Sequence, residues 1–532
     1  NVGRGVSTLA ATGWTNTGTA SMTKTFEYGA TIDLTTITPT RKSGYTGTGY
    51  TKSSGSGTLS GSSFTVGNGA ATITVSATGI TAPAGVTLTP TSTTKVYNYT
   101  DTTLTAATTT TYDSGISVYY NFGEATSSTG EPAYGTPSTT KTKTVSKTAY
   151  RGTKYYKVQV YATDGSLTSG TTTLSSASSV TLNNKTITFN ANNGTISGTS
   201  PLYASYSNAT LYTSATGTTA GTVPTATRSG YTFKGWYTAA SGGSQIYNAS
   251  GTITSTAVSG YTSGSKWVAT ENKTLYAQWT ANTITLKWAN GGRGTAPTTP
   301  ASCTYGSTFT MPAAMTATGY TFSKWSVNSK TFDAGASVTC NYTNLGKYSG
   351  EVTITGTWTN NVRTVTLDDA TNGGSGGSGK VYQKYATGWS LTNFGTTITK
   401  VTVPTKTNSV FTGYYTAASG GTRVIAADGT LPANTYYTST GATTLNAQFA
   451  SCSCTKGSNV SSCSVTGVSG NKCTYSYTCA NGYQTSGTFT GSAATGANTS
   501  PSCTPKVLTI TLRNYNDSAT HSTIYEKYAT GW

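Results

Sequence analysis

Residues 228–238 read Arg-Ser-Gly-Tyr-Thr-Phe-Lys-Gly-Trp-Tyr-Thr, and this stretch decides the fold of the 532-residue chain. Aromatic and polar side chains alternate along it, as in a β-strand with one buried face. The alternation predicts that Tyr231 and Phe233 point to one face and Trp236 to the other. A glycine beside a tryptophan inside a strand also indicates a β-bulge at Gly235, or a flat surface for the ring.

The same pattern returns several times along the chain. The clearest copy opens with Thr-Ile-Thr-Phe-Asn at residues 186–190 and closes with Thr-Leu-Tyr-Ala-Gln-Trp at residues 274–279. Two looser copies follow it. A degraded copy near the N-terminus keeps Gly-Tyr-Thr-Gly-Thr-Gly-Tyr-Thr at residues 44–51, lacks both tryptophans, and is expected to have a shorter final strand around residues 71–75. Such self-similarity indicates a tandem array of small structural units.

Each unit is expected to be a small sheet. A small sheet buries little surface, so large aromatic residues must supply much of its core. The aromatic residues at the repeat-defining positions are Tyr231, Phe233, Trp236, Trp279, Tyr320, Phe322, Trp325, Trp358, Phe411, Tyr414 and Phe449.

The composition favours sheet throughout the chain. Only 9% of the residues are charged, and Tyr (37) outnumbers Phe (12), while β-branched and aromatic residues fit a pleated surface. No stretch keeps the spacing of an amphipathic helix for three turns. Disorder is the alternative for a chain rich in Ser and Gly, but regularly placed aromatic residues oppose it. We expect disorder only in short tracts such as residues 373–379.

The repeated pattern resembles the Listeria–Bacteroides repeat, the B repeat of internalin-type bacterial surface proteins. The resemblance is closest for residues 184–280 and looser for 282–359 and 363–450. It implies small β-grasp-like or ubiquitin-like domains, carried in tandem on secreted or surface-anchored proteins as a stalk or adhesive element rather than a catalyst. The middle copy departs from the pattern at Ser323-Lys324, where a glycine is expected before the tryptophan.

The chain is therefore expected to be all-β dominated. Residues 116–122 and 155–162 are alternating strands in a stretch that does not repeat, which is typical of an immunoglobulin-like β-sandwich. The predicted segments are 1–85, a degenerate β repeat; 86–183, the immunoglobulin-like β-sandwich; 184–281, a β-grasp-like repeat; 282–360, a β-grasp-like repeat with an internal disulfide; 361–450, a β-grasp-like repeat; 451–505, a Cys-rich disulfide module; and 506–532, the first half of an incomplete repeat.

The eight cysteines indicate an oxidising compartment. Cys303 and Cys340 lie inside one repeat and are expected to form one bridge. Zinc is the competing interpretation for the other six, but there is no CxxC pair and the spacings are irregular, so three disulfides are favoured. Six cysteines allow about 15 connectivities, and the sequence does not choose among them. The six are Cys452, Cys454, Cys463, Cys473, Cys479 and Cys503.

Residues 507–532 begin another repeat, and residues 525–532 nearly duplicate residues 382–389. One interpretation is that the natural chain continues beyond this half-repeat. The other is that a neighbouring subunit completes it, because open strand edges invite pairing and head-to-tail completion builds a fibre. The residues proposed for that subunit junction are Tyr525, Tyr528 and Trp532.

The net charge of +18 is spread thinly, with no basic run longer than Arg41-Lys42. We therefore expect no nucleic-acid partner, and a weakly cationic surface that could attract anionic polysaccharide. No segment has the roughly 18 apolar residues of a membrane span. The chain begins at Asn1 without a signal peptide, as expected for a mature, processed or excised chain that is secreted or exposed on the cell surface.

Catalysis is not expected. One histidine, His521, 15 carboxylates and no catalytic motif leave no triad, cofactor site or metal site, and Asp368-Asp369 fits a turn better than a Ca²⁺ site. Two classes remain: a structural stalk or filament whose partner is another copy of the chain, and an adhesin that binds a glycan or a cell-surface protein. Exposure and clustering of aromatic residues outside the repeat pattern, such as Trp267 and Trp389, would favour the adhesin.

Overall fold

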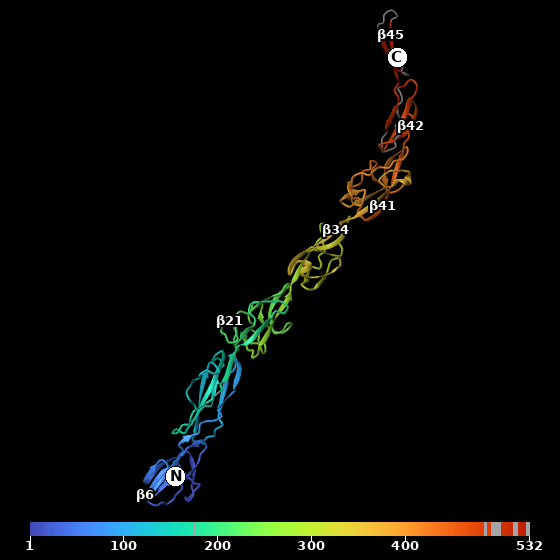
Figure 1. The fold of residues 1–532 in the computed structure, drawn as a ribbon. Coiled ribbons are helices and arrows are strands. Elements are labelled where there is room, and N and C mark those ends of the chain that lie inside the picture. The colour runs from blue at the N-terminus through green and yellow to red at the C-terminus, as the bar shows by residue number, and fades with distance from the viewer. Residues whose placement is uncertain (175, 484–486, 491–501, 514–519, 528–532) are drawn as a thin grey trace. The chain divides into compact units, whose positions relative to one another are not determined.

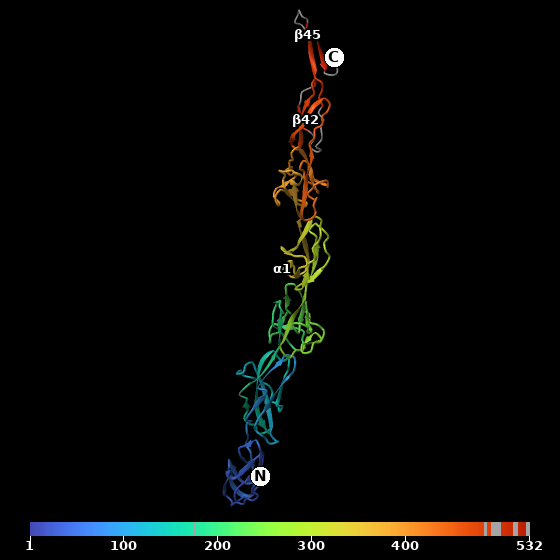
Figure 2. The ribbon, with the colours of Figure 1, turned by 90° about the vertical axis from the view of Figure 1, so that its right-hand side faces the viewer.

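The computed structural model describes all residues of the chain except 175, 484–486, 491–501, 514–519 and 528–532. Strands dominate both views (Figures 1 and 2), which confirms the all-β fold class. Within the described part, the only α-helix is a single turn, α1 (Tyr342–Leu345), labelled in Figure 2. The chain forms two compact units, residues 1–281 and residues 282–532.

Segment 1–85 has three small sheets, with strand orders β1-β3, β2-β6-β5 and β4-β7. Its final long strand, β6, covers 14 residues, so the prediction of a short strand around residues 71–75 was wrong. Pairing with β5 over most of its length explains the difference. The elements are β1 (Val6–Ala10), β2 (Thr31–Asp33), the 3-10 turn η1 (Leu34–Thr36), β3 (Thr38–Arg41), β4 (Tyr45–Thr46), β5 (Gly49–Ser60), β6 (Ser63–Ser76) and β7 (Gly79–Ile80).

Segment 86–183 has two sheets, ordered β13-β10-β8 and β12-β11-β14-β16-β9, with β15 paired to β14. Leu104 of the first sheet and Val158 of the second belong to one fully buried core, so the two sheets pack face to face. The immunoglobulin-like assignment stays a prediction. The strands are β8 (Thr87–Thr89), β9 (Ser92–Val96), β10 (Thr102–Ala107), β11 (Ser117–Ala125), β12 (Ala133–Tyr134), β13 (Thr142–Val145), β14 (Gly152–Thr163), β15 (Thr172–Thr173) and β16 (Ser178–Asn183).

Segment 184–281 is built on a seven-stranded sheet of order β21-β20-β19-β17-β27-β23-β24. The opening strand β17 pairs in parallel with the closing strand β27, and β23 pairs with the other edge of β27. The strands are β17 (Lys185–Asn190), β18 (Thr195–Ser197), β19 (Leu202–Ala204), β20 (Leu211–Tyr212), β21 (Ala220–Gly221), β22 (Thr225–Thr227), β23 (Tyr231–Tyr237), β24 (Gln245–Asn248), β25 (Thr262–Ser263), β26 (Lys266–Trp267) and β27 (Lys273–Ala281).

The predicted β-bulge lies in β23, between Phe233 and Gly235. The bulge adds one residue to the strand and shifts its alternation. Phe233 and Trp236 therefore lie on the same face, with ring centroids 5.4 Å apart, and the prediction of opposite faces was wrong. Gly235 has φ +127°, and a Cβ at this position would lie 2.2 Å from the carbonyl oxygen of Tyr247. The bulge therefore requires glycine here.

Segment 282–360 repeats this arrangement in a five-stranded sheet of order β29-β28-β34-β31-β32. Its bulge lies between Phe322 and Trp325, where the glycine is missing. The Thr357 hydroxyl accepts from the backbone N–H of Lys324 (3.1 Å) and donates to its carbonyl (2.8 Å), so a side chain satisfies the bulged residue. The strands are β28 (Thr283–Ala289), β29 (Ser302–Thr304), β30 (Thr308–Thr310), β31 (Tyr320–Val327), β32 (Lys330–Phe332), β33 (Ser337–Thr339) and β34 (Gly350–Asn360).

Segment 361–450 has a seven-stranded sheet of order β38-β37-β36-β35-β41-β39-β40. Its bulge lies between Phe411 and Gly413, as in the first repeat. The β-grasp-like assignment of the three repeats stays a prediction. The elements are β35 (Val362–Asp368), the 3-10 turn η2 (Ala370–Asn372), β36 (Lys380–Lys384), β37 (Gly388–Ser390), β38 (Thr397–Ile398), β39 (Ser409–Tyr415), β40 (Arg423–Ile425) and β41 (Gly441–Ser451).

Segment 451–505 contains an antiparallel sheet of order β42-β43-β44, and residues 506–532 contain the hairpin β45-β46. The disulfide predictions are confirmed: Cys303 bonds to Cys340, Cys452 to Cys473, Cys454 to Cys463, and Cys479 to Cys503. The strands are β42 (Val460–Ser469), β43 (Lys472–Cys479), β44 (Gly487–Thr490), β45 (Val507–Arg513) and β46 (Thr520–Lys527).

Gly235→Ala should destabilise the first repeat by about 3 kcal/mol, because alanine at this positive φ is strained and its Cβ meets the Tyr247 carbonyl. Gly242→Ala is the control, since Gly242 also has a positive φ (+65°) but open space around it, and its cost should be about 1 kcal/mol. Calorimetry of the full chain measures both. Equal costs at the two positions would contradict the bulge as described.

Candidate functional site

The repeat tryptophans are held by hydrogen bonds as well as by packing. Trp236 and Trp325 are fully buried, and their indole N–H groups donate to the carbonyls of Pro224 (2.8 Å) and Pro312 (3.0 Å). Each ring therefore ties the bulged strand to the proline that precedes it. The same hydrogen bond, from the tryptophan of the bulged strand to the carbonyl of the preceding proline, thus occurs in two of the repeats.

Most of the other repeat-defining residues pack in or against the cores of their repeats, whereas Tyr231 and Tyr320 lie under the guanidinium groups of Arg228 and Arg293, 3.8 Å and 4.0 Å from the ring centroids. Phe411 and Tyr414 are fully buried, whereas the remaining members are half-buried at the margins of the sheets: Tyr231, Phe233, Trp279, Tyr320, Phe322, Trp358 and Phe449. Of the proposed subunit-junction residues, Tyr525 lies in β46, and Tyr528 and Trp532 lie outside the described residues.

Trp267 and Trp389, which lie outside the repeat pattern, are buried rather than exposed. Their indole N–H groups donate to the Tyr247 hydroxyl and to the Pro432 carbonyl, each at 2.9 Å. Neither ring can contact a partner molecule without unfolding of its repeat. The exposed clustering of these residues that would favour an adhesin is therefore not found.

Asp368 and Asp369 are engaged by structural hydrogen bonds. The hydroxyl and the backbone N–H of Thr371 donate to Asp368 and hold the pKa of that carboxyl below its usual value. Asp369 accepts from the buried hydroxyl of Tyr414 at 2.5 Å, and burial together with this carboxylate raises the pKa of Tyr414. Over the described part of the chain, no group of three or more His, Cys, Asp or Glu side chains could hold a metal ion.

Single asparagines join the repeats. Asn361 is the only residue between β34 and β35, and it bonds to the segments on both sides. Its Oδ1 accepts from the Thr321 hydroxyl (2.6 Å) and its Nδ2 donates to the Thr438 carbonyl (2.5 Å). Its backbone N–H donates to Gly319, and its carbonyl accepts from the N–H of Tyr385. Four hydrogen bonds thus fix one residue against two modules.

Asn184 occupies the same place between β16 and β17, and it is 4% exposed. Its Oδ1 accepts from the Ser205 hydroxyl at 2.6 Å, and its backbone N–H donates to Ala215 at 2.8 Å. A buried amide with satisfied partners resists rotation, because breaking these bonds leaves polar groups unpaired. Both partners belong to the segment that follows, so these bonds fix Asn184 against residues 184–281.

Other contacts strengthen the joint at Asn184. The Tyr206 backbone exchanges hydrogen bonds with the preceding segment: its N–H donates to Tyr97 (3.2 Å), and its carbonyl accepts from Nδ2 of Asn98 (2.9 Å). The Arg151 guanidinium lies 3.9 Å from the ring centroid of Tyr97 and 5.0 Å from that of Tyr212. Segments 86–183 and 184–281 thus share hydrogen bonds and a cation–π sandwich.

Asn282 is the third single-residue connection, between β27 and β28. Its Nδ2 donates to the Tyr348 carbonyl at 3.3 Å, and its own carbonyl accepts from the N–H of Tyr305 at 2.8 Å. Both partners belong to the segment that follows. An asparagine therefore stands at each of the three connections.

Segments 1–85 and 86–183 meet at a buried carboxylate. Asp164 accepts from Nε of Arg4 (3.2 Å), the Tyr45 hydroxyl (3.0 Å) and the backbone N–H groups of Ser166 and Leu167. Burial opposes its ionisation, but the backbone donors, the hydroxyl and the arginine outweigh burial and hold the pKa of Asp164 below its usual value. The contacts at this junction thus favour the ionised form of the Asp164 carboxyl.

The Cys-rich hairpin docks on the third repeat through another asparagine. Asn471, in the turn between β42 and β43, accepts from the N–H of Phe411 (2.6 Å) and donates to its carbonyl (2.8 Å) and to that of Ala427 (3.0 Å). The Asn471 amide thus pairs with the backbone N–H and carbonyl of Phe411 in β39, much as a neighbouring strand would. This hairpin is therefore anchored by more than its covalent connection.

The joint asparagines were not singled out by the sequence reasoning. The signal is present, because Asn282 follows Trp279 by three residues and Asn361 follows Trp358 by three residues. Their significance depends on partners far along the chain, which the local pattern does not display.

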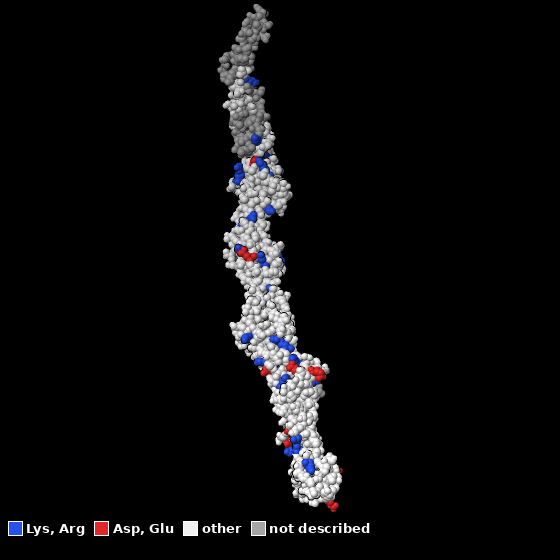
Figure 3. Space-filling model, turned by 90° about the vertical axis from the view of Figure 1, so that its left-hand side faces the viewer, with Lys and Arg blue, Asp and Glu red and all other residues white. Residues whose placement is uncertain are grey.

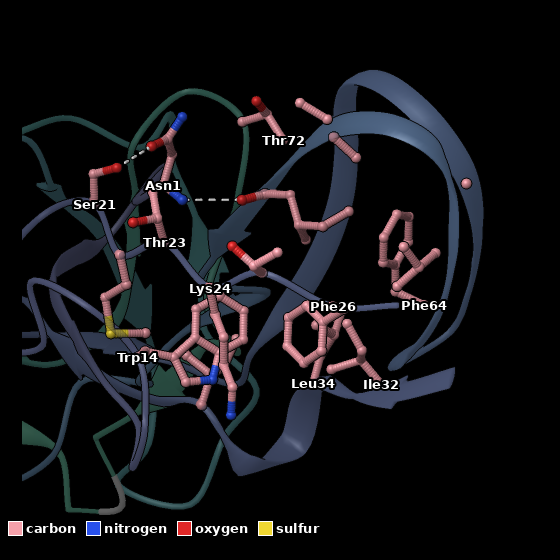
Figure 4. Close-up of a pocket in the computed structure, with 18 of the residues that line it drawn as sticks. Asn1, Trp14, Ser21, Thr23, Lys24, Phe26, Ile32, Leu34, Phe64 and Thr72 are labelled. Carbon is pink, nitrogen blue, oxygen red and sulfur yellow. Dashed lines mark hydrogen bonds between the residues drawn. The ribbon is translucent and has the colours of Figure 1, made fainter. Parts of the chain in front are cut away.

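Segment 1–85 contains an open groove of about 760 Å³. Figure 4 shows Trp14, Lys24 and Phe26 side by side along it. Residues 67–73 of β6 also line the groove. The rings of Trp14 and Phe26 meet edge to face at 5.6 Å, and Nζ of Lys24 lies 5.4 Å from the Phe26 centroid. Among the tryptophans whose side chains the structure describes, only Trp14 has an indole N–H with no protein acceptor.

Charge is sparse over the face shown in Figure 3, where Lys and Arg are scattered singly or in small groups. The exposed large side chains are tyrosines in the main. Tyr28 is 78% exposed, and Tyr342 and Tyr348, both about half exposed, stack at 4.6 Å. No helix in the described residues has the length and apolar character of a membrane span.

Comparison with known proteins identifies the repeats. The sequence model of the Listeria-Bacteroides repeat domain matches residues 186–278, 283–345 and 364–448. No curated protein and no solved structure matches the chain. The matched ranges do not include 1–85 or 506–532, so the incomplete copies predicted there stay predictions.

The repeat family and the four disulfides fit an extracellular or surface protein. The protein is thus a tandem array of β modules that carries three copies of the Listeria-Bacteroides repeat domain within residues 186–448.

Proposed function

We propose that this protein is a non-enzymatic structural protein of the bacterial cell surface or extracellular space, in which tandem β modules form a stalk. The observation that carries the proposal is the single-residue joint. A linker of one residue, hydrogen-bonded to its neighbours, leaves little conformational freedom, whereas flexible linkers are longer and rich in Gly and Ser. Asn361, with two bonds to each side, is the strongest instance.

The stalk could also extend by head-to-tail joining through residues 506–532. The support for this form is the sheet of β45 and β46, in which the described residues of 506–532 form two strands, whereas the main sheets of the complete repeats have five or seven. Electron microscopy of the isolated protein tests it. Ordered fibres would support joining, and separate particles at high concentration would oppose it.

Asn361→Gly should loosen its joint, because it removes two side-chain hydrogen bonds worth about 2 kcal/mol together. Labels at the exposed positions Lys330 and Lys380, introduced as non-natural amino acids to spare the disulfides, report the distance distribution by electron paramagnetic resonance. We expect a narrow distribution for the native joint and a broader one for the variant.

Asn393→Gly is the matched control, since Asn393 is exposed and lies away from the joints. It should leave the distribution narrow. A broad distribution in the unmodified protein would remove the support for a stalk, and an unchanged distribution in Asn361→Gly would show that the asparagine is not what fixes the joint.

Adhesion is the second candidate, and the groove of segment 1–85 favours it. Aromatic rings beside polar and cationic groups are the surface that sugars stack on and hydrogen-bond to, and the free indole N–H of Trp14 is a donor for such a ligand. Ser21, Thr23 and Asn68 add polar groups to the same groove. The proposed partner is a surface glycan.

Trp14→Ala should weaken glycan binding by about 2 kcal/mol if the groove is the site, since buried aromatic contacts dominate such interfaces. A glycan array probed with the full chain identifies a ligand, and titration with that ligand compares the variants. Tyr436→Ala removes an aromatic ring that is 47% exposed elsewhere and should leave affinity unchanged. Equal losses in both variants, or no glycan bound, would exclude this site.

A further inference from the structure

We propose that the repeats bear tension, with the parallel pair of opening and closing strands acting as a mechanical clamp in each. This inference rests on the proposed stalk function, because only a protein held at both ends is loaded along its chain. The pairs are β17 with β27, β28 with β34, and β35 with β41. In segment 86–183, β9 and β16 also pair in parallel.

The clamp follows from the direction of the load. Tension along the chain pulls the opening strand toward its own N-terminus and the closing strand toward its own C-terminus. In a parallel pair these two pulls slide the strands past each other, so every hydrogen bond between them is loaded at once. In a hairpin, both pulls act at the same end and the bonds break one after another.

The joints transmit this load without slack. The closing strand β34 continues into the opening strand β35 with only Asn361 between them, and Asn184 and Asn282 stand in the same place at the other two connections. A pull that reaches one closing strand therefore acts directly on the next opening strand. No coil has to straighten before the clamps are loaded.

The clamps differ in length. The ladder between β17 and β27 has four residue pairs, whereas β28–β34 and β35–β41 have six each. Hydrogen bonds that are loaded at the same time share the force, so a ladder with fewer bonds breaks at a lower force. We therefore expect the first repeat to rupture at a lower force than the other two.

Disulfide bonds take the place of such a clamp in segment 451–505. Within its described residues, segment 451–505 has only antiparallel pairs, β42 with β43 and β43 with β44, and a hairpin of this kind unzips. Its disulfides bridge 21 residues from Cys452 to Cys473 and 24 residues from Cys479 to Cys503. Under tension the covalent path therefore crosses the bridges, and only the stretch between Cys473 and Cys479 carries the load through the backbone.

Single-molecule force spectroscopy on the full chain, held by its two ends, tests the clamps. We expect discrete rupture events for segments 86–183, 184–281, 282–360 and 361–450, with that of 184–281 at the lowest force among the three repeats, and no extension from 451–505. A reducing agent should release segment 451–505 at low force. It should also lengthen the extension of 282–360 by about 120 Å, the 37 residues behind Cys303–Cys340.

A matched pair of variants separates the clamp from general stability. Thr188→Pro removes a ladder N–H from β17: the N–H groups of Thr186 and Phe189 bond to Asn272 and Ser200 on opposite edges, and alternation turns that of Thr188 toward β27. Ile246→Ala empties a fully buried site in β24, outside the clamp.

Calorimetry should show that both variants lower the stability of the first repeat. Only Thr188→Pro should lower its rupture force to that of the reduced hairpin β42–β43. If Thr188→Pro prevents the first repeat from folding, the rupture event of that repeat is lost. The clamp is then tested by the order in which the three repeats rupture in the unmodified chain.

The clamp is overturned if the oxidised chain extends without discrete events, or if Thr188→Pro and Ile246→Ala lower the rupture force equally. Rupture of 184–281 at a force equal to or above that of the six-pair repeats would also contradict it. Low rupture forces together with a narrow distribution of label distances across Asn361 would contradict the clamps but not the stalk function. A broad distribution of label distances would contradict the stalk function, whatever the rupture forces are.

Discussion

Parallel pairing of the first and last strands is the constraint on which each repeat depends. The closing strand lies inside the sheet, with the opening strand on one edge and the bulged strand on the other, as β27 lies between β17 and β23. Because the two terminal strands run in the same direction, the chain enters the sheet at one end of this pair and leaves at the other. One asparagine is then enough to connect a module to the next.

The aromatic pattern follows from the same constraint. A sheet of short strands, with little apolar surface, needs large rings on one face, and a strict alternation would send Trp236 to the wrong face. The bulge corrects this, and two solutions for it occur in one chain. Gly235 adopts a backbone conformation that other residues avoid, whereas in the second repeat the Thr357 side chain bonds to both backbone groups of Lys324.

Much of the fold could be predicted from the sequence, because strand alternation, turns and repeats are local signals. The all-β class, the tandem repeats and the presence of disulfides are of this kind. The face of Trp236 was mispredicted because one bulged residue reverses the alternation after it. The joint at Asn361 was missed because its side-chain partners, Thr321 and Thr438, lie 40 and 77 residues away. The groove beside Trp14 likewise depends on β6 packing near residues 21–28.

Hydrogen exchange of the backbone amides, resolved by residue in the full chain, tests the central position of the parallel pair most directly. Bonds that open only with the whole module exchange most slowly, whereas edge strands exchange by local opening. The account predicts the slowest exchange in β27, β34 and β41 and in the opening strands paired with them, and faster exchange in the edge strands β24, β32 and β40. Exchange of the closing strands as fast as that of the edge strands would contradict it.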